Sequence, residues 1–235
     1  MSEVRGFQSV LRQAAVTLLL AGGLAVGGSY QAAALENGDF ESGVLEPWTT
    51  FLTDNGTIGV PSIVDFDIDG PGGQPSSLAL ELRTGQVVHF TGLPPAGGGI
   101  EQIVSFNAGE LSISVDIAAV NPSTSDNLFG GFFELLFDGV ALDTAFDVGF
   151  LAGGESVFGM LSGSVVGVTE GDHLVAVRVT RPRQTSANPP ETPLQYVDNV
   201  ELSGSAVIPE PGSALLLAAA LLGLATLRKR SRNRA

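Results

Sequence analysis

The chain has 235 residues and a formal charge of −14, which suits one domain of ordinary size with appendages at its ends. Residues 35–211 contain 24 Asp or Glu but only four cations, a formal −20. A surface of this charge repels nucleic acids and anionic lipids, and its unbalanced carboxylates point to divalent cations as partners. The chain has no cysteine, so its core has to be stable without disulfides.

The start of the chain has the build of an export signal. Two arginines precede an apolar run over residues 14–26, and the small residues Ala32-Ala33-Ala34 follow. A basic start, a short apolar run and an A-x-A site are typical of a secretory signal peptide. We predict that residues 1–34 are such a peptide, processed after Ala34 so that the exported chain begins at Leu35. The alternative is an ordinary buried helix, which the glycines in and after the run would weaken.

Residues 35–205 have a period of two rather than the period of a helix. Apolar and polar residues alternate over 111–117, and a second alternation covers 173–180. Asp138-Gly139 stands between two apolar runs, which is a strong hairpin signal. The pattern predicts an all-β domain, a sandwich of the jelly-roll type with about nine strands and no helix. The expected strands lie at 78–83, 86–90, 100–106, 111–117, 131–137, 140–142, 157–166, 173–180 and 196–202.

Catalytic signals are weak. The two histidines, His89 and His173, lie in separate alternating strands, and the chain has neither a G-x-S-x-G motif nor a cysteine nucleophile. Acidic pairs that could hydrolyse glycosides are abundant by composition alone, so their presence says nothing. We therefore expect no enzymatic activity and no required cofactor.

One acidic stretch has the spacing of a calcium loop. Asp65, Asp67 and Asp69 alternate before Gly70, as carboxylates do at the start of an EF-hand. The twelfth position is Ser76 instead of Glu, which excludes a true EF-hand. The three carboxylates are still a candidate site for a structural calcium ion. The alternative is an exposed strand end followed by a turn.

Several fragments of the middle domain resemble galactose-binding-like jelly rolls, the group that includes many carbohydrate-binding modules. The fragments are residues 35–49, 99–118 and 196–202, with Leu-Glu-Asn-Gly-Asp-Phe-Glu at the first strand and Tyr-Val-Asp-Asn-Val-Glu-Leu at the last. The resemblance implies that Glu41 and Asp198, on adjacent terminal strands, share a structural calcium. It also makes Trp48 a candidate for stacking on sugars, although we favour a place in the core for this side chain.

The end of the chain is a three-part signal. The stiff tripeptide Pro209-Glu210-Pro211 precedes an uncharged apolar run that reaches residue 227. We predict a single short transmembrane helix at about 212–227 within a sorting segment over 206–235. The positive-inside rule then keeps the terminal cations in the cytoplasm and the acidic domain outside. These cations are Arg228, Lys229, Arg230, Arg232 and Arg234.

The order of these three parts resembles the PEP-CTERM sorting signal of Gram-negative bacteria, a tail that is sometimes labelled an ice-binding protein C-terminal domain. The resemblance implies processing by exosortase, a membrane enzyme, near the Pro-Glu-Pro motif. It also implies export across the inner membrane to the cell surface or beyond, in bacteria that make extracellular polysaccharide. A plain C-terminal anchor is the alternative for the tail.

Together these features predict a non-catalytic exported surface or matrix protein that associates with exopolysaccharide. A structural surface protein without a small ligand, a carbohydrate-active hydrolase and an ice-binding protein remain as alternatives. An exposed groove lined by Trp or Tyr would favour polysaccharide binding, and a buried Trp48 would favour the structural role.

Overall fold

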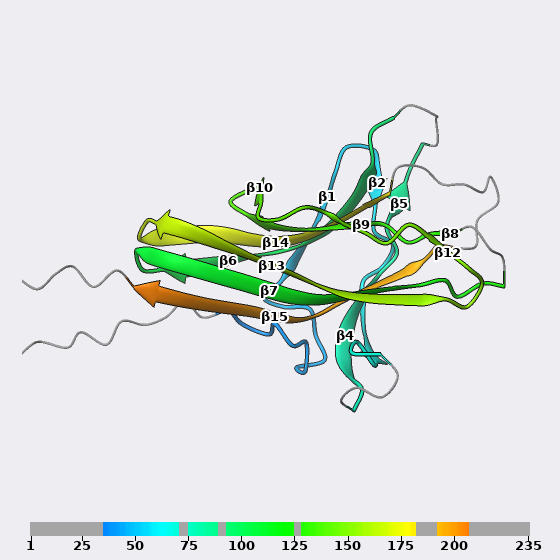
Figure 1. The fold of residues 1–235 in the computed structure, drawn as a ribbon, viewed down its shortest axis with the longest axis horizontal. Coiled ribbons are helices and arrows are strands. Elements are labelled where there is room, and N and C mark those ends of the chain that lie inside the picture. The colour runs from blue at the N-terminus through cyan, green and yellow to red at the C-terminus, as the bar shows by residue number, and fades with distance from the viewer. Residues whose placement is uncertain (1–34, 71–74, 89–92, 125–127, 182–191, 207–235) are drawn as a thin grey trace, which may run out of the picture. The chain divides into compact units, whose positions relative to one another are not determined.

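The computed structural model describes residues 35–70, 75–88, 93–124, 128–181 and 192–206. These residues fold into two antiparallel β-sheets that face each other as a sandwich (Figure 1). The described part of the chain is all-β, as the sequence predicted, and contains no helix. No helix that could cross a membrane is therefore found within these ranges.

The first sheet has six strands. Four of them follow the order β1-β6-β14-β9, and β10 and β11 both pair with β9 at its far side. Their bounds are β1 Thr49–Leu52, β6 Ala96–Phe106, β9 Phe132–Phe137, β10 Val140–Ala141, β11 Phe146–Asp147 and β14 Gly171–Arg181.

The second sheet has five strands in the order β13-β7-β15-β4-β3. Their bounds are β3 Ser62–Phe66, β4 Ser77–Leu82, β7 Gly109–Val120, β13 Ser156–Val168 and β15 Leu194–Ala206. Two small ladders complete the described fold, and they join β2 Gly56–Thr57 to β5 Gly85–Gln86 and β8 Leu128–Phe129 to β12 Phe150–Leu151.

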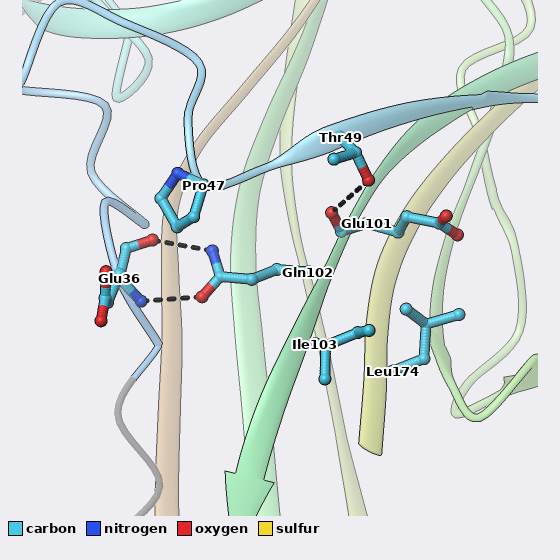
Figure 2. Close-up of a pocket in the computed structure, with 7 residues that line it drawn as sticks. All are labelled: Glu36, Pro47, Thr49, Glu101, Gln102, Ile103 and Leu174. Atoms are coloured by element: carbon cyan, nitrogen blue, oxygen red, sulfur yellow. Dashed lines mark hydrogen bonds between the residues drawn. The ribbon is translucent and has the colours of Figure 1, made fainter. Parts of the chain in front are cut away.

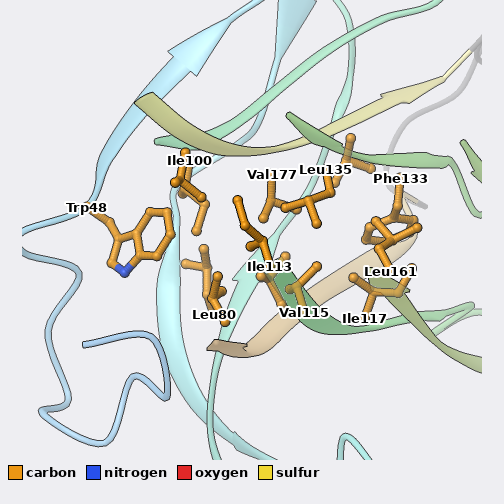
Figure 3. Close-up of a cluster of buried hydrophobic side chains, with 14 of the residues drawn as sticks. Trp48, Leu80, Ile100, Ile113, Val115, Ile117, Phe133, Leu135, Leu161 and Val177 are labelled. Carbon is orange, nitrogen blue, oxygen red and sulfur yellow. The ribbon is translucent and has the colours of Figure 1, made fainter. Parts of the chain in front are cut away.

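The core lies between the inner faces of the two sheets, where alternate residues of each strand meet (Figure 3). Val175, Val177 and Val179 of β14 are fully buried there, opposite the alternating Ile and Val of β7. Burying an aliphatic side chain of this size stabilises a fold by about 1.5–3 kcal/mol. The period-two pattern therefore explains why these segments form strands and which faces they bury.

The predicted strands are largely confirmed, with two differences. Residues 36–47 form turns instead of a first strand, and Asn37 and Phe40 adopt φ values of 52°. Of the run expected at 86–90, the described part ends its strand at Gln86 of β5, and Val87 and Val88 are exposed, while residues 89–90 lie outside the described ranges. The Asp138-Gly139 hairpin is confirmed, with φ of 49° and 78° at the two turn residues.

The turn segment at the start of the domain is held by the last strand. Strand β15 pairs with β7 up to Asp198 and again from Glu201, so Asn199 and Val200 form a bulge. The bulge frees the Val200 N–H, which donates to the Gly38 carbonyl oxygen at 2.8 Å. The first and last parts of the domain are therefore adjacent, although no strand pairing joins them.

The hairpin tip is tied to β14 by an ion pair. His173 Nδ1 lies 2.8 Å from Asp138 Oδ2, and Nε2 lies 2.9 Å from the Thr169 carbonyl oxygen. Because both acceptors need a proton from the ring, this geometry fits the doubly protonated imidazolium. The hydrogen bond to Asp138 raises the pKa of His173 despite partial burial of the ring. Burial opposes ionisation of Asp138, but the bonds from Leu174 N–H and His173 lower its pKa overall.

This pair predicts a stability change above neutral pH. A base whose pKa is raised on folding stabilises the fold below its unfolded pKa of about 6.5 and loses that contribution as pH rises through the folded value. The free energy of unfolding should therefore fall as pH rises above about 6.5, by less than about 1 kcal/mol because Asp138 is half exposed. Denaturant titration of wild type and His173→Gln checks this, since the variant should lack the step. An equal pH response in both proteins would contradict the assignment.

Candidate functional site

The outer face of the six-stranded sheet carries an open cleft with a volume of about 440 Å³. Its floor is formed by Glu134, Arg178 and Thr180, and its walls are formed by another residue of β9 and by residues from three other segments. The wall residues are Thr53, Asp54, Pro94, Pro95, Phe132 and Ala145. The volume lies within the range of about 300–1,000 Å³ that is usual for small-ligand sites.

A charged pair forms the polar centre of this cleft. Arg178 Nε donates to Glu134 Oε2 at 2.8 Å, and the two side chains are 32% and 19% exposed. The terminal nitrogens of Arg178 make no hydrogen bond to any residue within the described ranges. The guanidinium is thus fixed in orientation by Glu134 while four N–H groups remain for a ligand.

Strand register places these side chains together. Arg178 lies opposite Glu134 on β9 and opposite Gly99 on β6, while Thr180 lies opposite Phe132 and Gly97. A Cβ at Gly99 would lie 1.9 Å from the Val177 carbonyl oxygen, so only glycine permits this approach of β6 to β14. The floor of the cleft therefore has side chains on one flank of β14 and bare backbone on the other.

A second, smaller pocket of about 320 Å³ lies on the same face, nearer the other end of β14. Figure 2 shows that the Gln102 amide makes two hydrogen bonds to the backbone of Glu36, each 2.9 Å long. Gln102 is thereby used to hold the start of the domain against β6. The other lining residues are Pro47, Thr49, Glu101, Ile103 and Leu174, and Ile103 is 69% exposed.

A separate acidic cluster lies where the first turn, β4 and β15 meet. Leu78 N–H donates to Glu41 Oε1 at 2.8 Å, and Ser77 Oγ donates to Asp198 Oδ2 at 2.7 Å. Two consecutive residues of β4 thus donate to Glu41 and Asp198, the two carboxylates that the resemblance to jelly rolls placed together. Asp198 is fully buried, and Asn199 N–H donates to its other oxygen at 2.7 Å.

The cluster disfavours negative charge. Burial, together with the neighbouring carboxylates of Glu41 and Asp116, raises the pKa of Asp198 to about 6, although the hydrogen bonds from Ser77 and Asn199 lower it. Burial also raises the pKa of Asp116, which Asn199 Nδ2 contacts at 3.0 Å. An oxygen-binding cation would relieve this repulsion, and the donors fit calcium, which accepts carboxylate, carbonyl and water oxygens.

The other predicted calcium ligands are not gathered in the same way. Asp65 lies on edge strand β3 and is exposed, and Asp69 lies within the turn closed by the Gly70 N–H bond to the Asp67 carbonyl oxygen. Within the described ranges no group of three or more Asp, Glu or His side chains has a metal-binding arrangement. A calcium ion at Glu41 and Asp198 would therefore need backbone or water oxygens as its remaining ligands.

Trp48 belongs to the core. Its side chain is 2% exposed, it packs 6.1 Å from the ring of Phe40, and its Nε1 donates to the Asn37 carbonyl oxygen at 3.0 Å. Figure 3 shows the indole at one end of the buried cluster beside Ile100. The sugar-stacking role suggested for Trp48 is wrong for this fold, because neither face of the indole is open to a ligand.

The cleft residues were not singled out from the sequence. The available signal is that Glu134 is the one charged residue in Phe-Phe-Glu-Leu-Leu-Phe, and that Arg178 interrupts the valines of β14. Such residues mark the outer face of a strand. Their pairing depends on the register of β9 with β14, which the sequence does not show.

The predicted processing and membrane-stop residues lie outside the described residues. These are Ala32, Ala34, Pro209, Glu210, Pro211, Arg228, Lys229, Arg230, Arg232 and Arg234. Leu35, the expected first residue of the exported chain, is the first described residue and packs against the core.

No protein-family model matches the chain, and no curated protein matches it. Among solved structures, TmCBM61 in complex with β-1,4-galactotriose is 14% identical with a TM-score of 0.43, and the match covers 74% of this chain and all of that one. The CBM22-1 xylan-binding domain of Xyn10C from Paenibacillus barcinonensis is 11% identical with a TM-score of 0.40, over 77% and 97% of the two chains.

The Stig cyclase Fisc from Fischerella sp. TAU is 16% identical with a TM-score of 0.45, over 76% and 99% of the chains. Two of these three similar structures are carbohydrate-binding and one is a cyclase. Function therefore has to be argued from this chain's own residues.

The buried carboxylate of Asp198 predicts an unusual response to substitution. An acid whose pKa is raised on folding lowers the free energy of unfolding as pH rises from about 4 to about 6, and the loss persists above that range. In metal-free buffer at pH 8, Asp198→Asn should therefore have a free energy of unfolding about 1–3 kcal/mol higher than that of wild type. Its melting temperature should be higher as well. Thermal melts at pH 5 and pH 8 measure the effect. A variant that is less stable at both pH values would show that the charge is not the dominant feature.

Proposed function

We propose that this chain is a non-catalytic, exported polysaccharide-binding protein of the bacterial cell surface. The observation that carries the proposal is the Arg178–Glu134 pair in the open cleft, with four N–H groups free for a ligand. Sugar hydroxyls are neutral acceptors and donors that suit a fixed guanidinium–carboxylate pair, and Phe132 and the two prolines offer apolar surface for sugar C–H groups. The stacking expected of Trp48 plays no part in this proposal.

The shape of the face favours an extended ligand. Leu174 lines the smaller pocket and Arg178 lines the larger one, four residues apart on the same side of β14. At the rise of a strand this separation is about 13 Å, so a polymer running along β14 reaches both pockets. The formal charge of −20 over residues 35–211 repels anionic chains, which favours a neutral polysaccharide.

The predicted tail determines where the protein is located in the cell. In this proposal the segment 206–235 holds the chain in the inner membrane until exosortase processes it near Pro-Glu-Pro, after which the domain reaches the surface or the matrix. Support comes from the motif, the apolar run and the terminal cations in the sequence. A structural role without a sugar ligand is the second candidate, which the buried Trp48 favours.

We also propose a structural calcium ion at Glu41 and Asp198, which would join the first turn to the last strand. Because calcium binds the ionised carboxylate, millimolar calcium should raise the melting temperature of wild type more at pH 8 than at pH 5. Asp198→Asn should remove this response. A wild-type melting temperature that is indifferent to calcium and to chelator would reject the metal while leaving the polysaccharide proposal intact.

The sugar-binding proposal predicts a specific loss in Arg178→Ala. A hydrogen bond to a charged group contributes about 1.5–3 kcal/mol, so the variant should bind a neutral exopolysaccharide at least tenfold more weakly. Affinity electrophoresis in gels containing the polysaccharide measures the change. Arg83→Ala is the matched control, because Arg83 also pairs with a glutamate, Glu81, but near the end of β4 in the other sheet. Equal retention of both variants would contradict the cleft as the binding site.

The tail predicts a processing defect in Glu210→Ala. The substitution leaves the apolar run and the cations unchanged, so the protein should insert into the membrane but remain unprocessed. Replacing the five terminal cations by Ser should instead let the chain slip through with its tail attached. Mass spectrometry of the mature C-terminus in the native host distinguishes the two. A wild-type surface protein that still ends at Ala235 would identify the tail as a plain anchor.

A further inference from the structure

Strand β13 is a long free edge of the five-stranded sheet. It spans 13 residues, Ser156–Val168, and among the described strands it pairs with β7 alone. On its other side it makes no hydrogen bond to any residue in the described part of the chain. An edge of this kind presents a row of N–H and C=O groups that can pair with another chain.

The other sheet edges are short or protected. Strand β3 has five residues, contains Asp65 and begins after Pro61, while β1 has four residues and β10 has two. Charge, proline and short length are the usual means by which an edge avoids pairing. Strand β13 has none of them, and its Met160 and Val166 are 62% and 74% exposed.

The residue order of β13 is self-complementary about Ser162. When β13 strands of two copies pair antiparallel with Ser162 opposite Ser162, each large residue faces a small residue of the partner strand. On the core-side face, Leu161 lies opposite the partner's Gly163, and Val165 lies opposite the partner's Gly159. On the outer face, Met160 lies opposite the partner's Ser164. The bulge between Val165 and Val168 leaves Gly159–Val165 as the regular part of this pairing.

We propose that two copies of this chain associate through β13, antiparallel about Ser162, so that their five-stranded sheets become continuous. Cross-strand apolar pairs contribute to such an interface in addition to the backbone bonds. No acid lies within the regular part of this pairing, Gly159–Val165, so the register opposes no carboxylates there. Two copies of a strongly acidic protein would thus meet through β13, the one long strand of the described fold that contains no charged residue.

A cysteine at the symmetry position tests the proposal in the full-length protein, solubilised in mild detergent. The chain has no cysteine of its own, so every disulfide reports the introduced residue. Directly opposed residues in antiparallel strands have Cα atoms about 4.5–5.5 Å apart, which a disulfide can bridge. Ser162→Cys should therefore give at least tenfold more disulfide-linked dimer on mild oxidation than Ser62→Cys, an exposed serine on the opposite edge strand.

Ser164→Cys tests the register, because residue 164 faces the partner's Met160 and should cross-link much less than residue 162. Equal cross-linking of residues 62 and 162 would overturn the interface, and stronger cross-linking at 164 would overturn the centre at Ser162. A dimer of the uncrosslinked protein that persists in Ser162→Lys would likewise overturn it, since a lysine there adds two facing charges.

Salt gives an independent check by sedimentation velocity. The Debye length falls from about 30 Å at 0.01 M salt to about 8 Å at 0.15 M, so screening reduces repulsion between two acidic copies. The dimer fraction should rise over this range. A dimer fraction that falls with salt would indicate an ionic contact elsewhere and overturn the β13 interface. A protein that is monomeric at all salt concentrations and dimerises only when polysaccharide is added would overturn it too, and would indicate that the sugar bridges the two copies.

Discussion

The register of β14 with its two neighbours is the constraint on which both the core and the cleft depend. One side of β14 buries three valines in the sandwich, and the other side presents Leu174, Arg178 and Thr180. A shift of one residue would expose the valines and bury Arg178, so hydrophobic burial fixes the position of the polar pair. The cleft is in this sense a consequence of the packing on the opposite face of the same strand.

The effect of the acidic residues on stability differs between the surface, the site around Asp198 and strand β13. At the surface it costs little, because water and salt screen exposed carboxylates. At Asp198 the carboxylate is buried beside two other acids, and burial and their charges raise its pKa to about 6, so that ionising this group costs stability. On β13 the acids are absent, and the uncharged strand forms the one long edge of the described fold.

In segment 36–47 the expected proximity of Glu41 to Asp198 is correct, but the expected strand is wrong. Resemblance to galactose-binding-like jelly rolls predicted a first strand beside the last one, with Glu41 near Asp198. The two carboxylates are near each other, but a turn held by the β15 bulge and by the first residues of β4 brings them together. Within this turn Phe40 has a φ of 52° and its side chain is fully buried in the core.

The sequence alone determined the all-β class, most strands and the Asp138-Gly139 hairpin, because side-chain alternation and turn preferences are local properties. It also determined the burial that we favoured for the single tryptophan. Only the tertiary structure decided that Arg178 meets Glu134 across 44 positions of sequence, that Asp198 is buried, and that β13 lies at an edge. These features depend on the order and register of strands that are distant in the chain. Such pairings arise from packing of whole faces, which the periodicity of any one segment does not encode.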